Sequence, residues 1–185
     1  WLRRRLIPVT SRIVATEPLE PSLLSHLIPN NRLFGETRKM SHYFRLSPDG
    51  TRILMGGSEG ENSDDPARNG AALKNYISKI FPELTNVNIT HSWEGNVAFN
   101  LNFMPRLFSK NSIYYATGFC GSGVVWAWWI GQKAALKILG DKADNSVFEC
   151  EPPMAVPFYW GYPWFMPFVT TWFRLQDYLG ATSKK

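Results

Sequence analysis

Ile113–Val125 reads IYYATGFCGSGVV, a run of β-branched and aromatic residues that leads into three closely spaced glycines. A long apolar segment follows Gly118, Gly121 and Gly123. This order predicts a strand, a tight turn and the start of a buried helix. Glycine permits positive φ angles, and the first amides of a helix have no partner within it. The turn therefore suits anionic or electron-rich ligand atoms, although glycines there can also serve close packing alone.

The composition is that of a globular protein with a substantial core. The chain has 185 residues, of which 44% are hydrophobic and 19% charged. Its net charge is +5, but Arg3–Arg5 is the single dense basic run, which argues against nucleic-acid binding. Cys120 and Cys150 are too few for a disulfide framework and lack metal-ligand spacing, so we expect a cytoplasmic protein. No apolar run reaches the roughly 20 residues that span a membrane.

Most of the chain before residue 120 has the pattern of β-strands. Leu6–Thr16 predicts a half-buried strand, and Pro48-Asp49-Gly50 predicts the turn of a hairpin. The expected inward face of the first strand carries Ile7, Val9, Ile13 and Ala15. Further strands are expected at Tyr43–Ser47, Arg52–Met55, Val87–Thr90, Val97–Leu101 and Ile113–Thr117.

Two helices precede the C-terminal segment. Asp65 and Pro66 supply an N-cap and a first helical residue, with Asp64 and Asp65 interpreted as a solvated loop and cap. Apolar residues follow at helical spacing and predict packing on the sheet: Leu73, Tyr76, Ile77 and Ile80, with Pro82 after the end. The second helix, Val124–Leu139, is apolar on nearly all sides. We expect burial on several sides, part of it against something outside this chain.

The segment Pro152–Tyr178 is dense in aromatic residues and prolines and is expected to end in a short helix, Thr170–Leu179. Its prolines prevent one continuous amphipathic helix, which favours a segment that wraps over a domain surface. A contact between copies of the chain is one alternative. Membrane association through Trp160 and Trp164 is another, because tryptophan favours the lipid headgroup region.

The strand-turn-helix segment belongs to an ordered set of short motifs. The set comprises Pro8, Ala15-Thr-Glu-Pro-Leu19, Tyr43-Phe-Arg45, Pro48-Asp-Gly50, Gly56-Gly57, Phe81-Pro-Glu-Leu84, Trp93-Glu-Gly95, Met104-Pro105 and Ala116–Val124. In order and spacing it resembles the C-terminal half of the FAD-dependent amine and D-amino-acid oxidoreductases, the family of glycine oxidase and sarcosine oxidase. The resemblance spans nearly the whole chain.

The resemblance implies an α/β (α+β) fold. Residues 1–105 would form a substrate-binding domain, an antiparallel sheet with one helix. Residues 106–140 would supply the C-terminal strand and helix of a Rossmann-like FAD-binding domain, and 141–185 an aromatic, proline-rich tail. The family's Gly-x-Gly-x-x-Gly fingerprint follows no strand here, and the chain begins at Trp1. We therefore expect the N-terminal dinucleotide-binding half to lie on a longer polypeptide.

The implied cofactor is FAD, bound non-covalently because no cysteine stands where members form a covalent flavin link. The main chain at Gly118, Gly121, Ser122, Gly123 and Val124 would face the pyrimidine edge of the flavin, where a helix N-terminus stabilises negative charge. The implied reaction is oxidation of an amine to an imine by hydride transfer to flavin. The longer polypeptide would be the enzyme, and this chain alone would be inactive.

Four residues depart from the family pattern. Asn102 stands where many members have aspartate, so a charge near the flavin is missing. Asn96 and Val97 stand where glycine-oxidase-like members have an arginine that binds the substrate carboxylate. We therefore expect an amine or N-substituted amine as substrate, such as a polyamine conjugate. Cys120 stands where serine is common. No basic residue lies near it in sequence to lower the pKa of the thiol, so a reactive thiol is not predicted.

Candidate substrate contacts are Tyr43, Arg45 and Trp93. Tyr43 and Arg45 are two apart in an expected strand and so share one face of the sheet. The alternatives are a core tyrosine beside a surface arginine, and a core tryptophan. The three histidines, His26, His42 and His91, have neither metal nor triad spacing and are interpreted as structural hydrogen bonders. No catalytic side chain is assigned, because a flavoenzyme mainly positions its substrate over the cofactor.

A non-catalytic role is the alternative function: a fragment or degenerate relative that acts as an interaction or assembly subunit. An upstream extension with the dinucleotide fingerprint would favour the enzyme, whereas a natural start near Trp1 would favour the subunit. The expected partners are a small amine, the missing N-terminal half and, through the tail, another copy of the chain.

Overall fold

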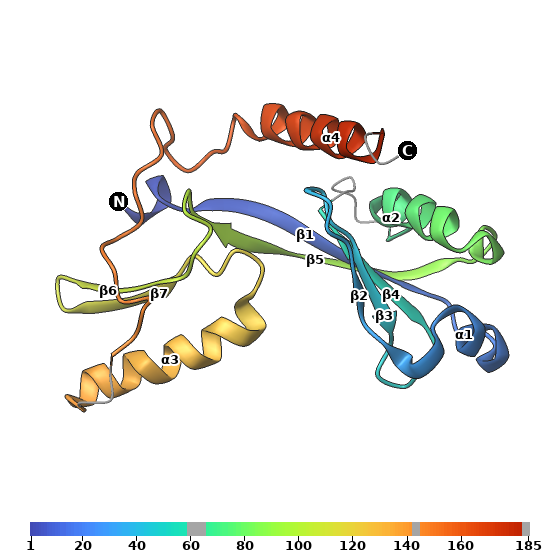
Figure 1. The fold of residues 1–185 in the computed structure, drawn as a ribbon, viewed down its shortest axis with the longest axis horizontal. Helices are drawn as coiled ribbons and strands as arrows, with labels where there is room; N and C mark the ends of the chain where they lie inside the picture. Colours follow the sequence, from blue (N-terminus) through green and yellow to red (C-terminus); the bar gives the residue numbers. More distant parts are fainter. Residues whose placement is uncertain (59–65, 142–144, 183–185) are drawn as a thin grey trace. The chain divides into compact units, whose positions relative to one another are not determined.

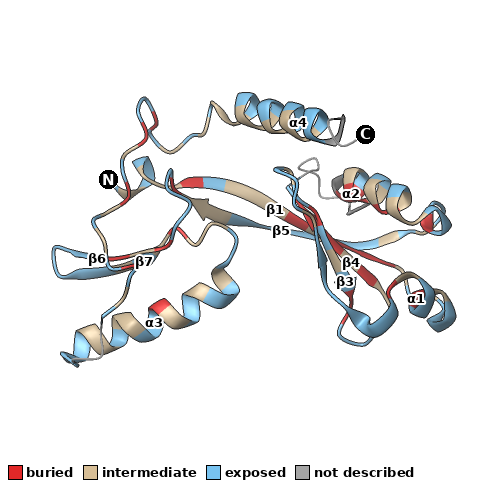
Figure 2. Cartoon of the chain, viewed as in Figure 1, coloured by how far each residue is buried: buried red, intermediate tan, exposed pale blue. Residues whose placement is uncertain are grey.

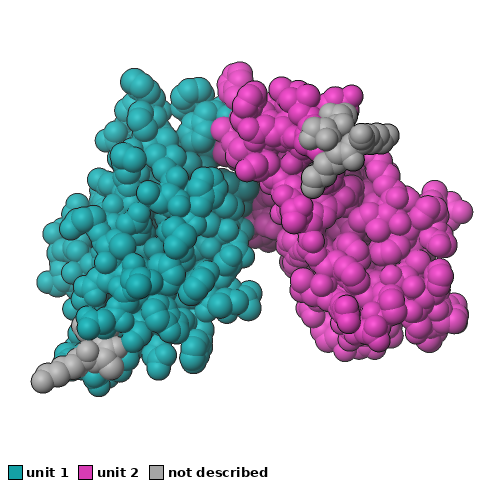
Figure 3. Space-filling view, viewed as in Figure 1, with its two compact units in different colours: residues 1–9, 96–165 teal, residues 10–95, 166–185 magenta. Residues whose placement is uncertain are grey.

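The computed structural model describes residues 1–58, 66–141 and 145–182. The chain divides into two compact units, unit 1 (residues 1–9 and 96–165) and unit 2 (residues 10–95 and 166–185), coloured separately in Figure 3. Strands β1 (Ile7–Thr16) and β5 (Ile89–Phe99) have residues in both units. These bounds differ from the expected segments 1–105, 106–140 and 141–185, and the roles assigned to those segments stay predictions.

A five-stranded sheet in the order β2-β3-β4-β1-β5 forms the scaffold of unit 2 (Figure 1). Its other strands are β2 (Phe34–Gly35), β3 (Tyr43–Leu46) and β4 (Ile53–Gly57). Strands β3 and β4 form the predicted antiparallel hairpin, and β4 pairs antiparallel with β1. At the hairpin turn, Gly50 has a φ of +71°, which glycine adopts without strain.

The helices of unit 2 are α1 (Pro21–Leu27), α2 (Pro66–Ile80) and α4 (Met166–Thr182). Leu73 and Ile77 of α2 are fully buried with Val14 and Met55 of the sheet, so the prediction that this helix packs on the sheet is confirmed (Figure 2). The predicted cap at Asp64 and Asp65 lies outside the described residues. Single 3₁₀ turns occupy Leu2–Arg4, Pro29–Asn31 and Pro82–Leu84.

The prediction of which side chains of β1 face inward was partly wrong. Val14 is completely buried in the core, whereas Ile13 is only half-buried. The reason is the close approach of α2, because a Cβ added at Gly70 would lie 2.8 Å from Val14 Cγ1. Since side chains alternate along a strand, the residues covered by α2 are the even-numbered ones.

Strand β5 is one strand of 11 residues rather than the predicted pair Val87–Thr90 and Val97–Leu101. The polar stretch Trp93-Glu-Gly95 between them stays in the strand, and Glu94 forms an ion pair with Arg12 of β1. Cross-strand pairing therefore overrides the local interruption in apolar pattern.

Unit 1 contains the hairpin β6 (Arg106–Lys110) and β7 (Ile113–Thr117), followed by α3 (Gly123–Leu139). The predicted strand, turn and helix are confirmed, whereas β6 was not predicted. Leu107, Ile130 and Phe148 form the small core beneath α3. Other apolar side chains of α3 are exposed in this chain, so their burial against something outside it stays a prediction: Val124, Val125, Trp128, Ile138 and Leu139.

The aromatic tail lies along the N-terminal residues of unit 1 before it continues into α4. Tyr159 is fully buried, and its hydroxyl donates to the carbonyl oxygen of Leu6 at 2.9 Å. The amide of Val156 donates to the carbonyl oxygen of Arg4 at 2.8 Å. Helix α4 has 17 residues and exceeds the predicted Thr170–Leu179 at both ends. Within the described part of the chain, no helix is long and apolar enough to cross a membrane.

Candidate functional site

The glycine turn, residues 118–122 between β7 and α3, is built from unusual backbone conformations. Gly118 and Gly121 have φ angles of +71° and +94°, and Cys120 between them has +51°. The two glycines adopt the positive φ angles that the sequence predicted. Cys120 adopts a positive φ as well, which costs energy because this residue carries a side chain. The conformation of the turn is therefore maintained by contacts with neighbouring residues.

Residues at the end of β5 hold this turn. The amide of Cys120 donates to the carbonyl oxygen of Ala98 at 3.2 Å, and Gly118 packs directly on Asn100. Within the turn, the amide of Ser122 donates to the carbonyl oxygen of Phe119 at 3.0 Å.

The beginning of α3 presents unused amides next to open space. The amides of Val125 and Trp126 both bond to the carbonyl oxygen of Ser122, at 3.2 and 3.1 Å. Within residues 66–141, the amides of Gly123 and Val124 have no acceptor, and Ser122 makes no side-chain cap. A Cβ at Gly121 would meet nothing within 4 Å. The positive end of the helix dipole and these donors suit an electron-rich ligand edge.

Cys120 is the one thiol in the turn. Burial raises its pKa, although a hydrogen bond from the main chain of Asn100 acts in the opposite direction. The thiol itself lies 3.1 Å from the carbonyl oxygen of Gly118. A raised pKa keeps the group as the unreactive thiol at neutral pH, which agrees with the sequence interpretation.

In unit 2, Tyr43 and Arg45 lie on the same exposed face of β3, as their spacing predicted. The ring of Tyr43 lies over Gly56 of β4, where an added Cβ would come within 2.1 Å of the ring. The Tyr43 hydroxyl lies 3.3 Å from Ser11 Oγ of β1. Residues of three neighbouring strands thus meet on this face.

Trp93 is 44% exposed, so it is a surface residue rather than a core tryptophan. Its neighbour Glu94 pairs with Arg12, and Arg12 is on the face of β1 covered by α2. Alternation along β5 therefore directs Trp93 to the opposite face, that of Tyr43. We call this face, with Ser11, Tyr43, Arg45, Gly56 and Trp93, the open face of the sheet.

The positions that depart from the family pattern lie in unit 1. The side chain of Asn102 is exposed. Asn96 and Val97 line a pocket of about 240 Å³ together with Arg3 and Tyr159.

No role was assigned from the sequence to two contributors to the candidate site, Asn100 and the pair Gly56-Gly57. Asn100 carried no recognisable signal, whereas the Gly56-Gly57 pair could have indicated a close side-chain approach.

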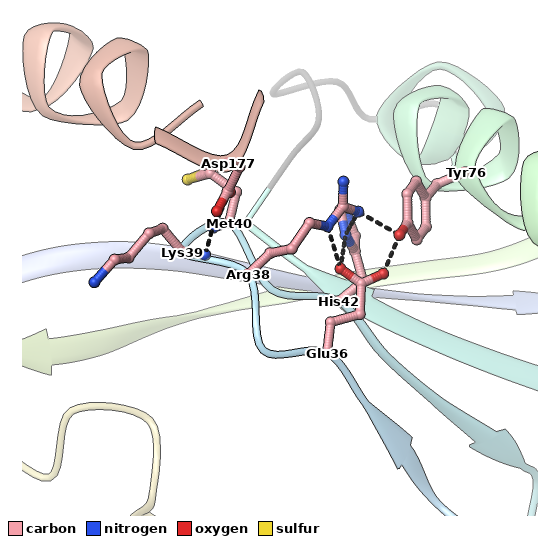
Figure 4. Close-up of polar contacts among 7 residues, drawn as sticks. All are labelled: Glu36, Arg38, Lys39, Met40, His42, Tyr76 and Asp177. Atoms are coloured by element: carbon pink, nitrogen blue, oxygen red, sulfur yellow. Dashed lines mark hydrogen bonds and ion pairs between the residues drawn. The ribbon is translucent and has the colours of Figure 1, made fainter. Parts of the chain in front are cut away.

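A polar cluster links the loop before β3 to two helices of unit 2 (Figure 4). Glu36 accepts hydrogen bonds from Arg38 Nε at 2.6 Å and from the Tyr76 hydroxyl. His42 is buried and stacks on Tyr76 with ring centres 3.8 Å apart, which fits the structural role predicted for it. Burial raises the pKa of Glu36, but the bonds from Arg38 and Tyr76 outweigh it and hold the pKa below its usual value.

Candidate metal ligands do not cluster within residues 1–58, 66–141 and 145–182. No three side chains among His, Cys, Asp and Glu come together there as ligands. The candidate binding groups are the main-chain amides of unit 1 and, described separately, the side chains of the open face of unit 2.

The chain is similar in sequence to known oxidoreductases. A family model described as FAD dependent oxidoreductase (DAO) matches residues 1–136. The gamma-glutamylputrescine oxidoreductase of Escherichia coli is 30% identical over 184 residues, which cover 97% of this chain and 42% of that protein. A probable oxidoreductase, OrdL, of Haemophilus influenzae is 34% identical over 150 residues, which cover 80% of this chain and 33% of that protein.

Solved structures show the same fold at low sequence identity. Glycine oxidase from Geobacillus kaustophilus superposes with a TM-score of 0.59 at 17% identity, covering 84% of this chain and 40% of that one. Iminodiacetate oxidase from Chelativorans sp. BNC1 superposes with a TM-score of 0.57 at 19% identity, covering 83% and 42%. The chain thus spans less than half the length of these relatives.

Proposed function

Because the chain belongs to the FAD-dependent oxidoreductase (DAO) family, we propose that it is part of an enzyme that oxidises an amine or N-substituted amine to an imine. Bound FAD supplies the acceptor for the hydride that leaves the carbon next to nitrogen, while the nitrogen gives up a proton. The chain's own residues hold the cofactor edge and the substrate. The imine then hydrolyses in water.

The unused amides at the start of α3 carry this proposal. Gly123 and Val124 begin the helix beside Gly121, where the absence of side-chain atoms leaves room for a planar ligand edge. Main-chain donors and a helix dipole stabilise charge that gathers on an electron-rich edge. The donor set therefore fits the pyrimidine edge of a flavin, and Gly118, Gly121, Ser122, Gly123 and Val124 are the proposed cofactor contacts, made without a covalent link.

The substrate is proposed to contact the open face through Tyr43, Arg45 and Trp93. Asn96 and Val97 provide no cation for a carboxylate, which favours an amine over an α-amino acid. The name of the Escherichia coli relative, gamma-glutamylputrescine oxidoreductase, supports an N-substituted amine of the polyamine kind. Saturable, tight oxidation of simple D-amino acids by the full-length enzyme would contradict this substrate class.

The first experiment is a visible absorption spectrum and an intact mass of the full-length protein as isolated. We expect flavin absorption, a mass well above 21.1 kDa, and release of free FAD on denaturation. A colourless full-length protein that binds no added FAD would contradict the proposal.

A matched pair of glycine variants then tests the turn. Gly121→Val should lose FAD or lower its reduction potential, because valine strains a φ of +94° and fills the open space. Gly140→Val imposes a similar strain, at φ +70°, on the other end of α3. We expect the control to keep flavin and potential. Unchanged FAD affinity and potential in Gly121→Val would remove the turn from the cofactor site.

A further inference from the structure

Asn100, the residue that follows β5, has a buried side chain whose carboxamide bonds to the main chain of the residues that follow it. It is 1% exposed. Its Nδ2 donates to the carbonyl oxygen of Met104 at 2.7 Å. Its Oδ1 accepts from the amides of Asn102 at 3.1 Å and of Met104 at 3.4 Å. These partners leave one orientation for the carboxamide, with its nitrogen toward Met104.

The same carboxamide forms the surface on which the glycine turn begins. A Cβ added at Gly118 would lie 2.4 Å from Asn100 Nδ2, closer than any real contact. Gly118 also has a φ of +71°. Both steric room and backbone conformation therefore require glycine there, and Asn100 sets how near the turn approaches β5.

Two main-chain contacts complete the attachment. The amide of Cys120 donates to the carbonyl oxygen of Ala98, and the main chain of Asn100 bonds to the Cys120 thiol. The turn contains three residues with positive φ, Gly118, Cys120 and Gly121. Such backbone persists only where neighbouring groups hold it.

We infer that Asn100 is a positioning residue for the flavin: it holds the glycine turn so that the amides at the start of α3 meet the cofactor edge. This inference rests on the proposed function. Asn100 acts through Gly118 and Cys120 and touches no substrate. Its loss should therefore weaken FAD binding and lower the flavin potential while the amine KM is unchanged.

The test measures the Kd of FAD for the flavin-free full-length protein and the reduction potential of the reconstituted enzyme. Asn100→Ala should raise the Kd about tenfold and lower the potential. Asn86→Ala, the same change at an exposed position in unit 2, should alter neither. Asn100→Asp keeps the shape but replaces the donor to Met104 with a carboxylate oxygen, so it should lower the potential further than alanine.

Gly118→Ala reaches the same contact from the other side and should reproduce the loss of affinity. In the double variant, Asn100→Ala vacates the space that the new Cβ at position 118 enters. We therefore expect the loss in Kd for the double variant to be smaller than the product of the two single losses. This coupling would not arise if each change only lowered general stability.

Each outcome decides the inference. Wild-type FAD affinity and potential in folded Asn100→Ala would overturn it, as would purely multiplicative losses in the double variant. If Asn100→Ala does not fold, Gly118→Ala alone decides, and an unchanged Kd overturns the inference. If the wild-type protein itself binds no FAD, the proposed function fails, which is a separate result.

Discussion

The carboxylate of Asp177 accepts a hydrogen bond from the main-chain amide of Met40 at 3.0 Å, and so joins α4 to the loop that precedes β3. Its other oxygen accepts from the amide of Lys39 at 2.8 Å. Because the two amides bond to different oxygens of Asp177, and an amide nitrogen cannot accept, Asp177→Asn in the same geometry keeps only one of these bonds. We expect faster hydrogen exchange at Lys39 and Met40 in that variant.

The matched control is Gln176→Ala, the neighbouring residue on α4, which should leave exchange in the loop unchanged. Desolvation raises the pKa of Asp177, but the bonds from Met40 and Lys39 and the charge of Arg38 hold it below its usual value. The attachment therefore stabilises at pH values above the unfolded-state pKa and is lost as pH falls through the folded-state pKa. Hydrogen exchange at the Met40 amide that changes neither with the substitution nor with acid pH would contradict this role of Asp177.

Gly56 and Tyr43 form the second testable contact. In Gly56→Ala the new Cβ would come within 2.1 Å of the Tyr43 ring, so the ring must swing away from Ser11. We expect a small loss of stability, about 1 kcal/mol, because the exposed ring can move. In the full-length enzyme the amine KM should rise severalfold, with FAD affinity unchanged, if Tyr43 contacts substrate.

Gly35→Ala is the control for this change, since an added Cβ at Gly35 meets nothing within 4 Å. It should leave both KM and stability near wild type. A normal KM in Gly56→Ala, together with a normal KM in Tyr43→Ala, would remove Tyr43 from the substrate site.

The hydroxyl of Tyr76 provides a third prediction. It donates to Glu36 and accepts from Arg38, so Tyr76→Phe removes a bond to a charged, half-buried carboxylate. We expect a loss of about 1–2 kcal/mol in the free energy of unfolding at pH 7, measured by urea denaturation. The stacking of the ring on His42 is retained, which limits the change to the hydroxyl.

The pH dependence distinguishes this bond from a packing effect. The folded-state pKa of Glu36 lies below its ordinary value, so its contribution is present at neutral pH and lost as pH falls through that pKa. The difference between wild type and Tyr76→Phe should therefore shrink in acid. Tyr114→Phe, on an exposed tyrosine of β7, should show no difference at either pH. A pH-independent loss in Tyr76→Phe would argue for packing instead.

Local signals in the sequence were sufficient for the turn and the hairpin. Gly118 and Gly121 do adopt positive φ, and Gly50 closes the β3–β4 turn, because these conformations depend mainly on the residue itself. The contribution of Asn100 could not be predicted in this way. It depends on the residue after β5 meeting the turn after β7, which brings Asn100 and Gly118 together from 18 positions apart.

The face of β1 shows the same limit. Ile13 and Val14 are both apolar, so alternation alone allows either to be inward. The choice is made by Gly70, which lets α2 approach Val14. Likewise, the polar stretch around Glu94 predicts a break in the strand, but Glu94 pairs with Arg12 of β1 and the strand continues. Each error concerns a contact between distant segments rather than a local preference.

Cys120 offers the last prediction, because its thiol reports on the environment of the glycine turn. Burial raises its pKa, so alkylation by iodoacetamide in flavin-free full-length protein should be slow at neutral pH and should rise only above the range of a free thiol, about 8.5. Mass spectrometry of the Cys120 peptide follows the rate, and Cys120→Ser identifies its signal. Added FAD should slow the reaction further if the cofactor covers the turn. Rapid labelling that levels off below pH 8 would contradict the buried thiol.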